Sequence, residues 1–469
     1  MKMKKSILPV LLAVALATAA CTSNTKRQTA TLSDDSLYTT FRDPGHEWRG
    51  KPFWSWNGRL EKDELIRQLH IFKEMGMGGA FLHSRVGLKT EYLGQEWFDL
   101  TNAVADEAEK IGMEAFLYDE DRWPSGSAGG MVTENPAYRM NFVTLYTMPA
   151  EEFKWDNDSI VSAFVCKLDG IDYSPESDMT RYAGKTVLKF QHETEKCSDG
   201  YNGTTYLDPM NREATDRYIY LTHDQYEKHC GARLGGNIQG IFTDEPHRGG
   251  LFTSHESKTD GVTSGIHHIP WTPKLPKEYK KAYGEDLTAE LPKIFLRENG
   301  ERVNDAKWQY CDLVQTLFLK NFAQPQYDWC TKHNMIYTGH VLHENSFSNQ
   351  VTMQGSLMRF YEYQHNPGVD MLTEHDNSYW VVKQLSSASW TKNGCCRNCT
   401  AAPAGSSTLR TTRPSATGRR CSASTCAVTT CRGTRWKARP NGTTRPASST
   451  NPPGGKNIST SKTTSRGWA

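Results

Sequence analysis

Residues 52–57, PFWSWN, begin a series of short apolar segments that continues with AFLH at 80–83 and EAFLY at 114–118. The stretches between them, 60–75 and 95–111, carry apolar side chains at the spacing of helices that bury one face. Glycine follows each of these helices directly and is a common stop signal. This strand–helix–strand–helix–strand order predicts a parallel sheet, because parallel neighbours need a crossover connection.

Later segments extend the same pattern. We predict strands at 240–243, 335–340 and 368–372, and helices at 212–229 and 305–333, the second broken near its internal proline. Six strands, mostly separated by helices, favour an α/β fold and specifically an incomplete (β/α)8 barrel of the TIM type. The rival is a doubly wound open sheet, but no glycine-rich phosphate loop follows the first strand.

The chain divides into four parts on this interpretation. Residues 1–21 form a signal peptide, 22–39 a polar tether, 40–390 the partial barrel and 391–469 a tail of different composition. Within the barrel, alternating apolar residues at about 135–205 predict a small β insertion.

The first 21 residues have the pattern of an export signal. Lysines precede an apolar run at 7–20, which is short for a spanning helix of about 20 apolar residues. Small residues lead up to Cys21, as in a bacterial lipobox, so Cys21 is the predicted lipidation site and the outer membrane the predicted anchor. Plain cleavage to a soluble periplasmic protein and an uncleaved anchor are the alternatives. In each case the chain is predicted to be exported.

Charge separates the tail from the rest. The 55 basic and 53 acidic residues of the 469-residue chain leave a net charge of +2, which excludes a nucleic-acid binder held by bulk charge. Residues 391–469, however, contain no Asp or Glu and 14 Lys and Arg, so the remainder carries 41 basic against 53 acidic residues. Six of the 12 cysteines also lie in this tail.

Charged and aromatic residues gather at or just beyond the predicted strand ends, which converge on one face of a barrel. Taken singly, each has an ordinary structural explanation: tryptophans pack in cores, and an Asp-Glu pair caps or forms a salt bridge. Together, carboxylates and aromatic rings predict a site for an oligosaccharide or polysaccharide. The candidate residues for binding this substrate are Trp54, Trp56, Asn57, His83, Arg85, Asp119, Glu120, Arg122, Trp123, Asp244, His340 and His343.

Glu245 is the first candidate for a catalytic carboxylate, because it follows an apolar strand almost directly. A buried neighbour such as Asp244 would raise the pKa of Glu245 and suit it to acid catalysis. Glu344 and Glu374 are the candidates for a second catalytic carboxylate. The structural alternative for Glu245 is a salt bridge with an arginine, either Arg122 or Arg248.

Asp119, Glu120 and Asp121 form an oxygen-rich cluster that suits Ca²⁺, although their spacing matches no EF-hand loop. A loop neutralised by arginine is the alternative. No His/Cys pattern with zinc-ligand spacing occurs before the tail.

Several of these motifs together resemble glycoside hydrolase family 106, which comprises bacterial α-L-rhamnosidases and relatives acting on plant polysaccharides. The resemblance covers about residues 40–384. It is carried by FRDP at 41–44, KPFWSWN at 51–57, GMGG at 76–79, HSR at 83–85, YDEDRWPSG at 118–126 and FTDEP at 242–246. The resemblance implies a (β/α)8 catalytic domain, an inverting mechanism with two glutamates, of which Glu245 is one, and calcium at the sugar site. Family members are much longer, with β domains after the barrel that this chain lacks.

The tail matches neither the family nor a packed domain. It is too poor in apolar residues to offset the entropy of ordering. We interpret it as the product of a frameshift near residue 388. Residues 393–401, read with the last base of each codon joined to the next two, allow Trp-Met-Leu-Ser-Glu-Leu-Tyr-Gly, an apolar strand with a glutamate. A basic nucleic-acid arm and a six-cysteine disulfide or zinc module are the alternatives.

The sequence therefore predicts a truncated glycoside hydrolase whose activity is impaired. A non-catalytic carbohydrate-binding lipoprotein is the second hypothesis, and an unrelated protein with a basic interaction tail is the third.

Overall fold

The computed structural model describes residues 35–156, 158–166, 173–175, 178–251, 257–259, 262–264, 267–296, 303–370 and 379–391. The predicted signal peptide with Cys21, most of the tether, Glu374 and nearly all of the tail lie outside these residues. The chain separates into residues 1–45, which contribute helix α2 (Asp35–Arg42), and residues 46–469, which hold every other element. Within the described part, no helix has both the length and the apolarity needed to cross a bilayer.

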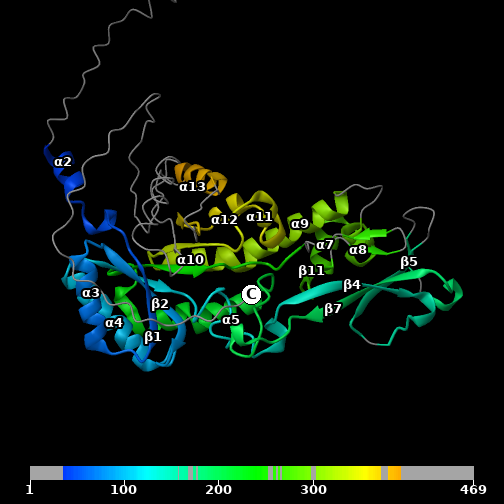
Figure 1. Cartoon of the computed structure of the whole chain (residues 1–469), viewed down its shortest axis with the longest axis horizontal. Coiled ribbons are helices and arrows are strands. Elements are labelled where there is room, and N and C mark those ends of the chain that lie inside the picture. Colours follow the sequence, from blue (N-terminus) through cyan, green and yellow to red (C-terminus); the bar gives the residue numbers. More distant parts are fainter. Residues whose placement is uncertain are drawn as a thin grey trace, which may run out of the picture. The chain divides into compact units, whose positions relative to one another are not determined.

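The main sheet contains six parallel strands (Figure 1). In spatial order they are β1 (Phe53–Gly58), β2 (Gly79–Leu88), β3 (Glu114–Tyr118), β8 (Ile238–Asp244), β12 (Ile336–His340) and β13 (Asn366–Pro367). Because chain order equals spatial order, this sheet lacks the reversal that defines a doubly wound fold. No pairing among the described residues joins β13 back to β1, so the strands form an open parallel sheet.

Two strands differ from their predicted extents. Strand β2 continues to Leu88, so His83 and Arg85 lie inside the strand and not at its end. Strand β13 is only two residues long and begins before the predicted 368–372 segment.

Helices follow most of these strands. They are α3 (Lys62–Glu74), α4 (Gln95–Lys110), α5 (Arg212–Leu221), α6 (His223–Cys230), α9 (Asp305–Phe318) and α10 (Gln324–Lys332). The single helix predicted at 212–229 is thus two helices, which meet at Thr222. The helix predicted at 305–333 passes through a π-helical turn at Leu319–Ala323, and Pro325 lies in the first turn of α10. The predicted break lies a few residues late, because the wider π-helical turn precedes the proline.

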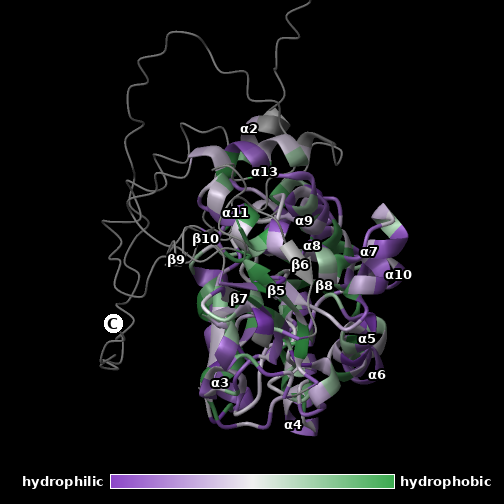
Figure 2. Ribbon diagram, turned by 90° about the vertical axis from the view of Figure 1, so that its right-hand side faces the viewer, coloured by the Kyte–Doolittle hydropathy of each residue, from purple (hydrophilic) through white to green (hydrophobic). Residues whose placement is uncertain are grey.

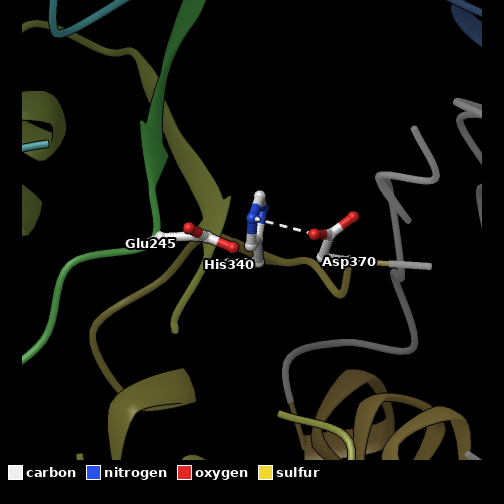
Figure 3. Close-up of side chains that lie close together, drawn as sticks. All are labelled: Glu245, His340 and Asp370. Atoms are coloured by element: carbon white, nitrogen blue, oxygen red, sulfur yellow. Dashed lines mark ion pairs between the residues drawn. The ribbon is translucent and has the colours of Figure 1, made fainter. Parts of the chain in front are cut away.

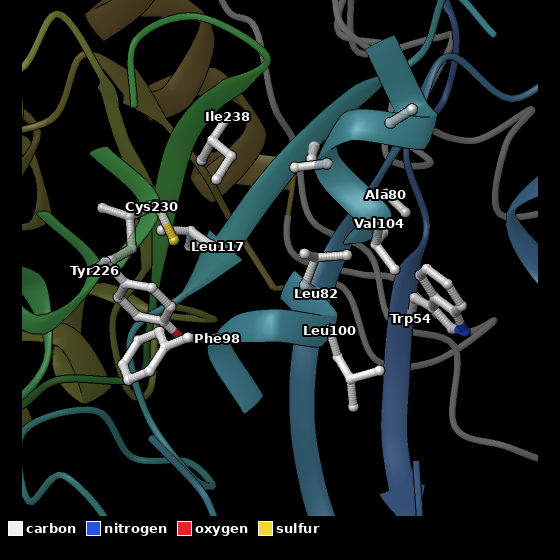
Figure 4. Close-up of a cluster of buried hydrophobic side chains, with 14 of the residues drawn as sticks. Trp54, Ala80, Leu82, Phe98, Leu100, Val104, Leu117, Tyr226, Cys230 and Ile238 are labelled. Carbon is white, nitrogen blue, oxygen red and sulfur yellow. The ribbon is translucent and has the colours of Figure 1, made fainter. Parts of the chain in front are cut away.

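The largest hydrophobic cluster fills the space between the sheet and α3, α4 and α6 (Figure 4). Trp54 and Trp56 belong to this cluster, with 4% and 1% of their surface exposed. Their rings contact edge to face at 5.5 Å, and Trp56 meets Trp97 in the same way at 5.2 Å. The prediction that both tryptophans bind sugar is therefore wrong: they point away from the face that carries the charged strand ends and contribute packing.

A second, antiparallel sheet has the order β11-β4-β7-β5-β6. Its strands are β4 (Asn141–Pro149), β5 (Ile160–Cys166), β6 (Tyr173–Pro175), β7 (Thr186–Thr194) and β11 (His268–Trp271). Strand β11 pairs with β4 from well beyond the predicted insertion at 135–205. Apolar residues of this sheet pack against α7 (Leu275–Tyr283), α8 (Leu287–Phe295) and α9.

The remaining elements are shorter. They include the hairpin of β9 (Ser257–Thr259) and β10 (Val262–Ser264), and the helices α11 (Phe347–Met353), α12 (Leu357–Tyr361) and α13 (Tyr379–Thr391). Hydrophobic residues concentrate on the strands, while the outer helices α3, α4 and α6 are largely hydrophilic (Figure 2). This division is what amphipathic helices over a sheet produce.

Replacing Trp56 by alanine tests its assignment to the core. We expect Trp56→Ala to lower the free energy of unfolding by about 3–5 kcal/mol, the usual cost of emptying a large aromatic site. Ser55→Ala, an exposed position on the same strand, is the matched control and should change little. Denaturant titration measures both; equal stability of the two variants would contradict the assignment.

Candidate active site

Asp244 is the last residue of β8, and side chains from three other strands contact its carboxylate. The Tyr118 hydroxyl of β3 donates a 2.7 Å hydrogen bond to its Oδ2. His340 Nε2 of β12 lies 3.1 Å from Oδ1, and His83 Nε2 of β2 lies 3.8 Å from Oδ2. The four side chains can meet because they alternate onto the same face of adjacent parallel strands.

These contacts determine which groups carry charge. Burial alone would raise the pKa of Asp244, but the charge and hydrogen bond of His340, helped by His83, hold it well below its usual value. For His340 the effects are reversed. Burial alone would lower its pKa, but Asp244 and then Asp370 raise it to about 10. Asp244 is therefore ionised and His340 is an imidazolium at neutral pH.

Glu245 turns out of the strand at this point. Its φ of 51° lies in the left-handed region, which is unusual for a residue with a Cβ. Ser125 and Asp244 fix this corner through two hydrogen bonds, from Ser125 N to Asp244 O at 2.7 Å and from Asp244 N to Ser125 Oγ at 2.8 Å. Glu245 N then donates to the His340 carbonyl at 3.1 Å.

The turn brings the Glu245 carboxylate to His340 and Asp370 (Figure 3). One ligand atom from each of these three residues lies within 4.8 Å of the others. Burial raises the pKa of Glu245 to about 7; Asp244 and Asp370 act in the same direction, and His340 and Arg85 oppose them. A carboxyl group that is half protonated near neutral pH suits general acid catalysis.

Glu344 is buried beside Asp370, and its carboxylate bonds backbone N–H groups. Its Oε2 accepts a 2.7 Å hydrogen bond from Asp370 N, and its Oε1 accepts one from Val341 N at 3.3 Å. Burial raises the pKa of Glu344 to about 8, with His340 acting in the opposite direction. Glu344 therefore positions Asp370, whose own side chain reaches His340 at 3.8 Å.

Asp370 is a site residue that the sequence reasoning did not select. The available signal is its place in the sixth predicted strand, at 368–372. Its proximity to Glu245 depends on the short β13, and no sequence pattern reports that length.

The three acidic residues predicted as a calcium cluster do not converge. Glu120 accepts hydrogen bonds from the backbone N–H groups of residues 121, 126, 127, 128 and 129, which makes it the anchor of its loop. Asp119 accepts from Ser125 Oγ, and Asp121 pairs with Arg122 at 2.9 Å. Arg122 thus neutralises Asp121 alone, and Glu120, with 1% of its surface exposed, serves the loop backbone and not a substrate. Arg122 is only partly buried and stays a candidate for substrate contact.

Glu245, His340 and Asp370 are the described residues whose donor atoms could hold a metal together. An imidazole in the set suits transition metals and zinc better than Ca²⁺, which prefers oxygen ligands. His340 is also protonated and directed at Asp244, so a metal would have to displace that ion pair. The trio is therefore a poor fit for calcium.

The other predicted residues occupy different surroundings. Asn57 is exposed on β1, and Trp123 is half-exposed in the loop after β3, so both are open to a ligand. Arg85 acts on Glu245 electrostatically. His343 has a φ of 58° in the turn after β12. The proposed salt bridge of Glu245 with Arg122 or Arg248 does not form, since Arg122 bonds Asp121 and Arg248 bonds carbonyl groups.

Comparisons with known proteins show low sequence identity to this chain. No family model matches this chain. A curated protein of Formosa agariphila, named "Putative beta-glucuronidase", is 29% identical over 356 residues, which are 64% of this chain and 30% of that protein. The chain thus spans less than a third of that relative's length.

Solved structures show weaker likenesses. A rhamnosidase from Novosphingobium sp. PP1Y is 13% identical with a TM-score of 0.49, covering 78% of this chain and 52% of that one. The PgaB (BpsB) glycoside hydrolase domain from Bordetella bronchiseptica is 11% identical with a TM-score of 0.34, covering 74% and 82%. Such low TM-scores do not establish a common fold.

The pH dependence of the free energy of unfolding tests the ion pair between His340 and Asp244. The pKa of His340 in the folded protein, about 10, lies above its ordinary value of 6.5. Its stabilisation is therefore complete below about pH 6.5 and is lost as pH rises toward about 10. We expect His340→Gln to be less stable than the original protein at pH 6, and this difference to shrink by pH 10. Denaturant midpoints across this range measure it; a difference independent of pH would contradict the pair.

Proposed function

We propose that this chain is the catalytic part of an exported glycoside hydrolase and that Glu245 is its general acid. The observation that carries the proposal is the Glu245 carboxyl group, with its pKa near 7, held beside an ionised Asp244 and a cationic His340. Its place at the carboxyl end of a parallel strand supports it, because barrel enzymes carry their chemistry there. The glycosidase name of the curated relative supports the same reaction class.

The six strands in sequential order are consistent with three quarters of a (β/α)8 barrel, and we propose that architecture. The concave face would be the inner one. Its lower layer is aromatic, with Phe81, Phe116, Tyr118 and Phe242 packed together. Above it lies a polar layer of His83, Asp244 and His340. Apolar filling below and charged groups at the open end are the normal arrangement of such an interior.

In the proposed reaction Glu245 gives its proton to the oxygen of the departing sugar or alcohol. Asp244 and His340 do not transfer that proton. Asp244 helps to keep the proton on Glu245, and the cationic His340 limits how far the pKa rises. We propose that the exposed residues Trp123 and Asn57 contact the substrate. On the basis of the sequence motifs, we propose an α-L-rhamnosidic linkage of plant-type polysaccharide as that substrate.

The stereochemistry depends on the second carboxylate. Inversion needs a base about 6.5–9.5 Å from the acid, so that water fits between them. Asp370 approaches Glu245 too closely for that, with ligand atoms within 4.8 Å. We propose that an inverting base comes from outside the described residues, where Glu374 lies. Export, lipidation of Cys21 and the frameshift remain proposals carried by the sequence.

Hydrolysis assays test the function. We expect Glu245→Gln to lower kcat on aryl α-L-rhamnosides by about 10²–10⁴-fold, the usual contribution of a general acid. The activity of the chain with Glu245 unchanged should fall above about pH 7, because Glu245 then loses its proton. Glu213→Gln, on the surface in a pair with Lys274, is the matched control.

The assay should use this chain and a version with the reading frame restored near residue 388, on aryl α-L-rhamnosides and aryl β-glucuronides. Cleavage of glucuronides alone would keep the reaction class and overturn the rhamnoside proposal. Sugar binding without cleavage by either version would favour the non-catalytic carbohydrate-binding alternative.

A further inference from the structure

Arg85 is a charged residue of the candidate active site that takes no part in the proposed proton transfer. It lies in β2, two residues beyond His83, so the two side chains project from the same face of the strand. Phe81, two residues before His83, belongs to the aromatic layer of that face. Along β2 this face therefore runs from the aromatic layer through the polar layer to Arg85, toward the end of the sheet at which Glu245 lies.

The charge of Arg85 has no direct partner in the described part of the chain, where its guanidinium forms neither a hydrogen bond nor an ion pair. Arg122, in the loop after β3, differs because it pairs with Asp121 at 2.9 Å. Arg85 is also only partly buried, so a ligand can reach it. A guanidinium stays charged and carries five N–H donors, so Arg85 has donors to offer a substrate.

Arg85 is close enough to Glu245 to influence its ionisation. Burial raises the pKa of Glu245 to about 7, and the cations His340 and Arg85 oppose this rise. His340 is directed at Asp244, 3.1 Å away, whereas Arg85 forms no such contact within the described ranges. An anionic group on a substrate bound at Glu245 would therefore meet Arg85 as the available cation.

The next step rests on the proposed function. A general acid contacts the glycosidic oxygen, which the two linked sugars share. L-Rhamnose is a deoxy sugar without an ionisable group. In a rhamnoside, an anionic group that lies near Glu245 consequently belongs to the sugar that leaves.

We propose that Arg85 binds the carboxylate of a uronic acid in the leaving position, so that the substrate is a rhamnosyl uronate segment of an acidic polysaccharide. A planar guanidinium suits a carboxylate because it can donate two hydrogen bonds in parallel. Arg85 is on this account a residue that determines specificity, while Glu245 performs the proton transfer.

A bound carboxylate would also keep Glu245 protonated. Besides burial, Asp244 and Asp370 raise the pKa of Glu245, and His340 and Arg85 lower it. The negative charge of the substrate would offset Arg85 and so raise the pKa of Glu245 in the complex. A neutral sugar in the same position leaves the charge of Arg85 unbalanced and gives no such rise.

Two pairs of matched disaccharides test the proposal on the full chain. Rhamnosyl D-glucuronate is compared with rhamnosyl D-glucose, and rhamnosyl D-galacturonate with rhamnosyl D-galactose, all joined through sulfur so that they resist hydrolysis. We expect at least one acid to bind about tenfold or more tightly than its neutral partner, since the neutral compound lacks the charge-assisted hydrogen bonds. Calorimetry and ligand-observed NMR measure the dissociation constants. Equal constants within both pairs, or no saturable binding of either acid, would overturn the proposal.

Variants of two arginines locate the binding. Arg85→Gln should remove the preference for the acid, whereas Arg85→Lys should keep part of it, because lysine retains the charge but not the two parallel donors. Arg67→Gln, on α3 and bonded to Glu64 at 2.7 Å, is the matched control and should keep the full preference. A preference that survives Arg85→Gln would assign the carboxylate to another cation and refute the proposal.

The ionisation of Glu245 gives a readout that a merely structural arginine would not move, and it needs no variant of Arg85. We expect the pH midpoint of the protonated Glu245 band in the infrared to rise when the acid disaccharide binds, and to stay constant with the neutral one. Sugar carboxyl groups ionise well below neutral pH, so the ligand adds no protonated band there. An unchanged midpoint with the acid bound would contradict the proposal.

Hydrolysis separates this proposal from the proposed function. The oxygen-linked forms of the same disaccharides are given to the original chain and to Glu245→Gln. Cleavage that depends on Glu245, with equal kcat/KM for acid and neutral substrates, would overturn the role of Arg85 and support the function. Acid-selective binding that depends on Arg85, without cleavage of any substrate, would overturn the function and support Arg85 as the residue that binds the uronate.

Discussion

The buried ion pair of Asp244 and His340 joins the ends of β8 and β12, and the hydroxyl of Tyr118 ties β3 to the same carboxylate. Such a pair is costly to form, because both charges leave water, and it is maintained only with good geometry and further hydrogen bonds. Here the further side-chain hydrogen bond comes from the Tyr118 hydroxyl of β3, and His83 of β2 lies 3.8 Å from the same carboxylate. The arrangement consequently requires the strands to keep their register, and this register places Glu245 and Asp370 near each other.

The consequences for Glu245 follow from that pair. A carboxyl group at the end of a strand would ordinarily ionise well below neutral pH. Burial with two acidic neighbours raises its pKa, and His340 prevents a larger rise. The backbone corner at Glu245, with its positive φ, depends on Ser125, which is itself bonded to Asp119 in the loop anchored by Glu120. Residues predicted as ligands thus act as supports for the acid.

The buried charge of Arg248 is stabilised differently from that of Asp244. Asp244 has its counter-ion within the protein, whereas Arg248 relies on carbonyl groups and lies at the edge of a cavity. Both occur within five consecutive residues, Asp244 at the end of β8 and Arg248 in the segment that follows it.

Sequence reasoning predicted the parallel strands and selected Glu245 as the candidate acid, because apolar runs and a following carboxylate are local signals. It misplaced Trp54 and Trp56, since alternation along a strand shows that two side chains share a face but not which face meets the helices. Short-range periodicity does not report contacts between segments that are far apart in the sequence. Three features depend on such contacts: the pairing of β11 with β4, the approach of Asp370 to His340, and the burial of Arg248.

Difference infrared spectroscopy of the carboxyl band, comparing the original chain with Glu245→Gln, measures the central quantity directly. The account predicts that the protonated band assigned to Glu245 disappears with a midpoint near pH 7. A midpoint at or below the ordinary value of 4.5 would show that Glu245 is ionised at neutral pH, and it would contradict its assignment as the acid.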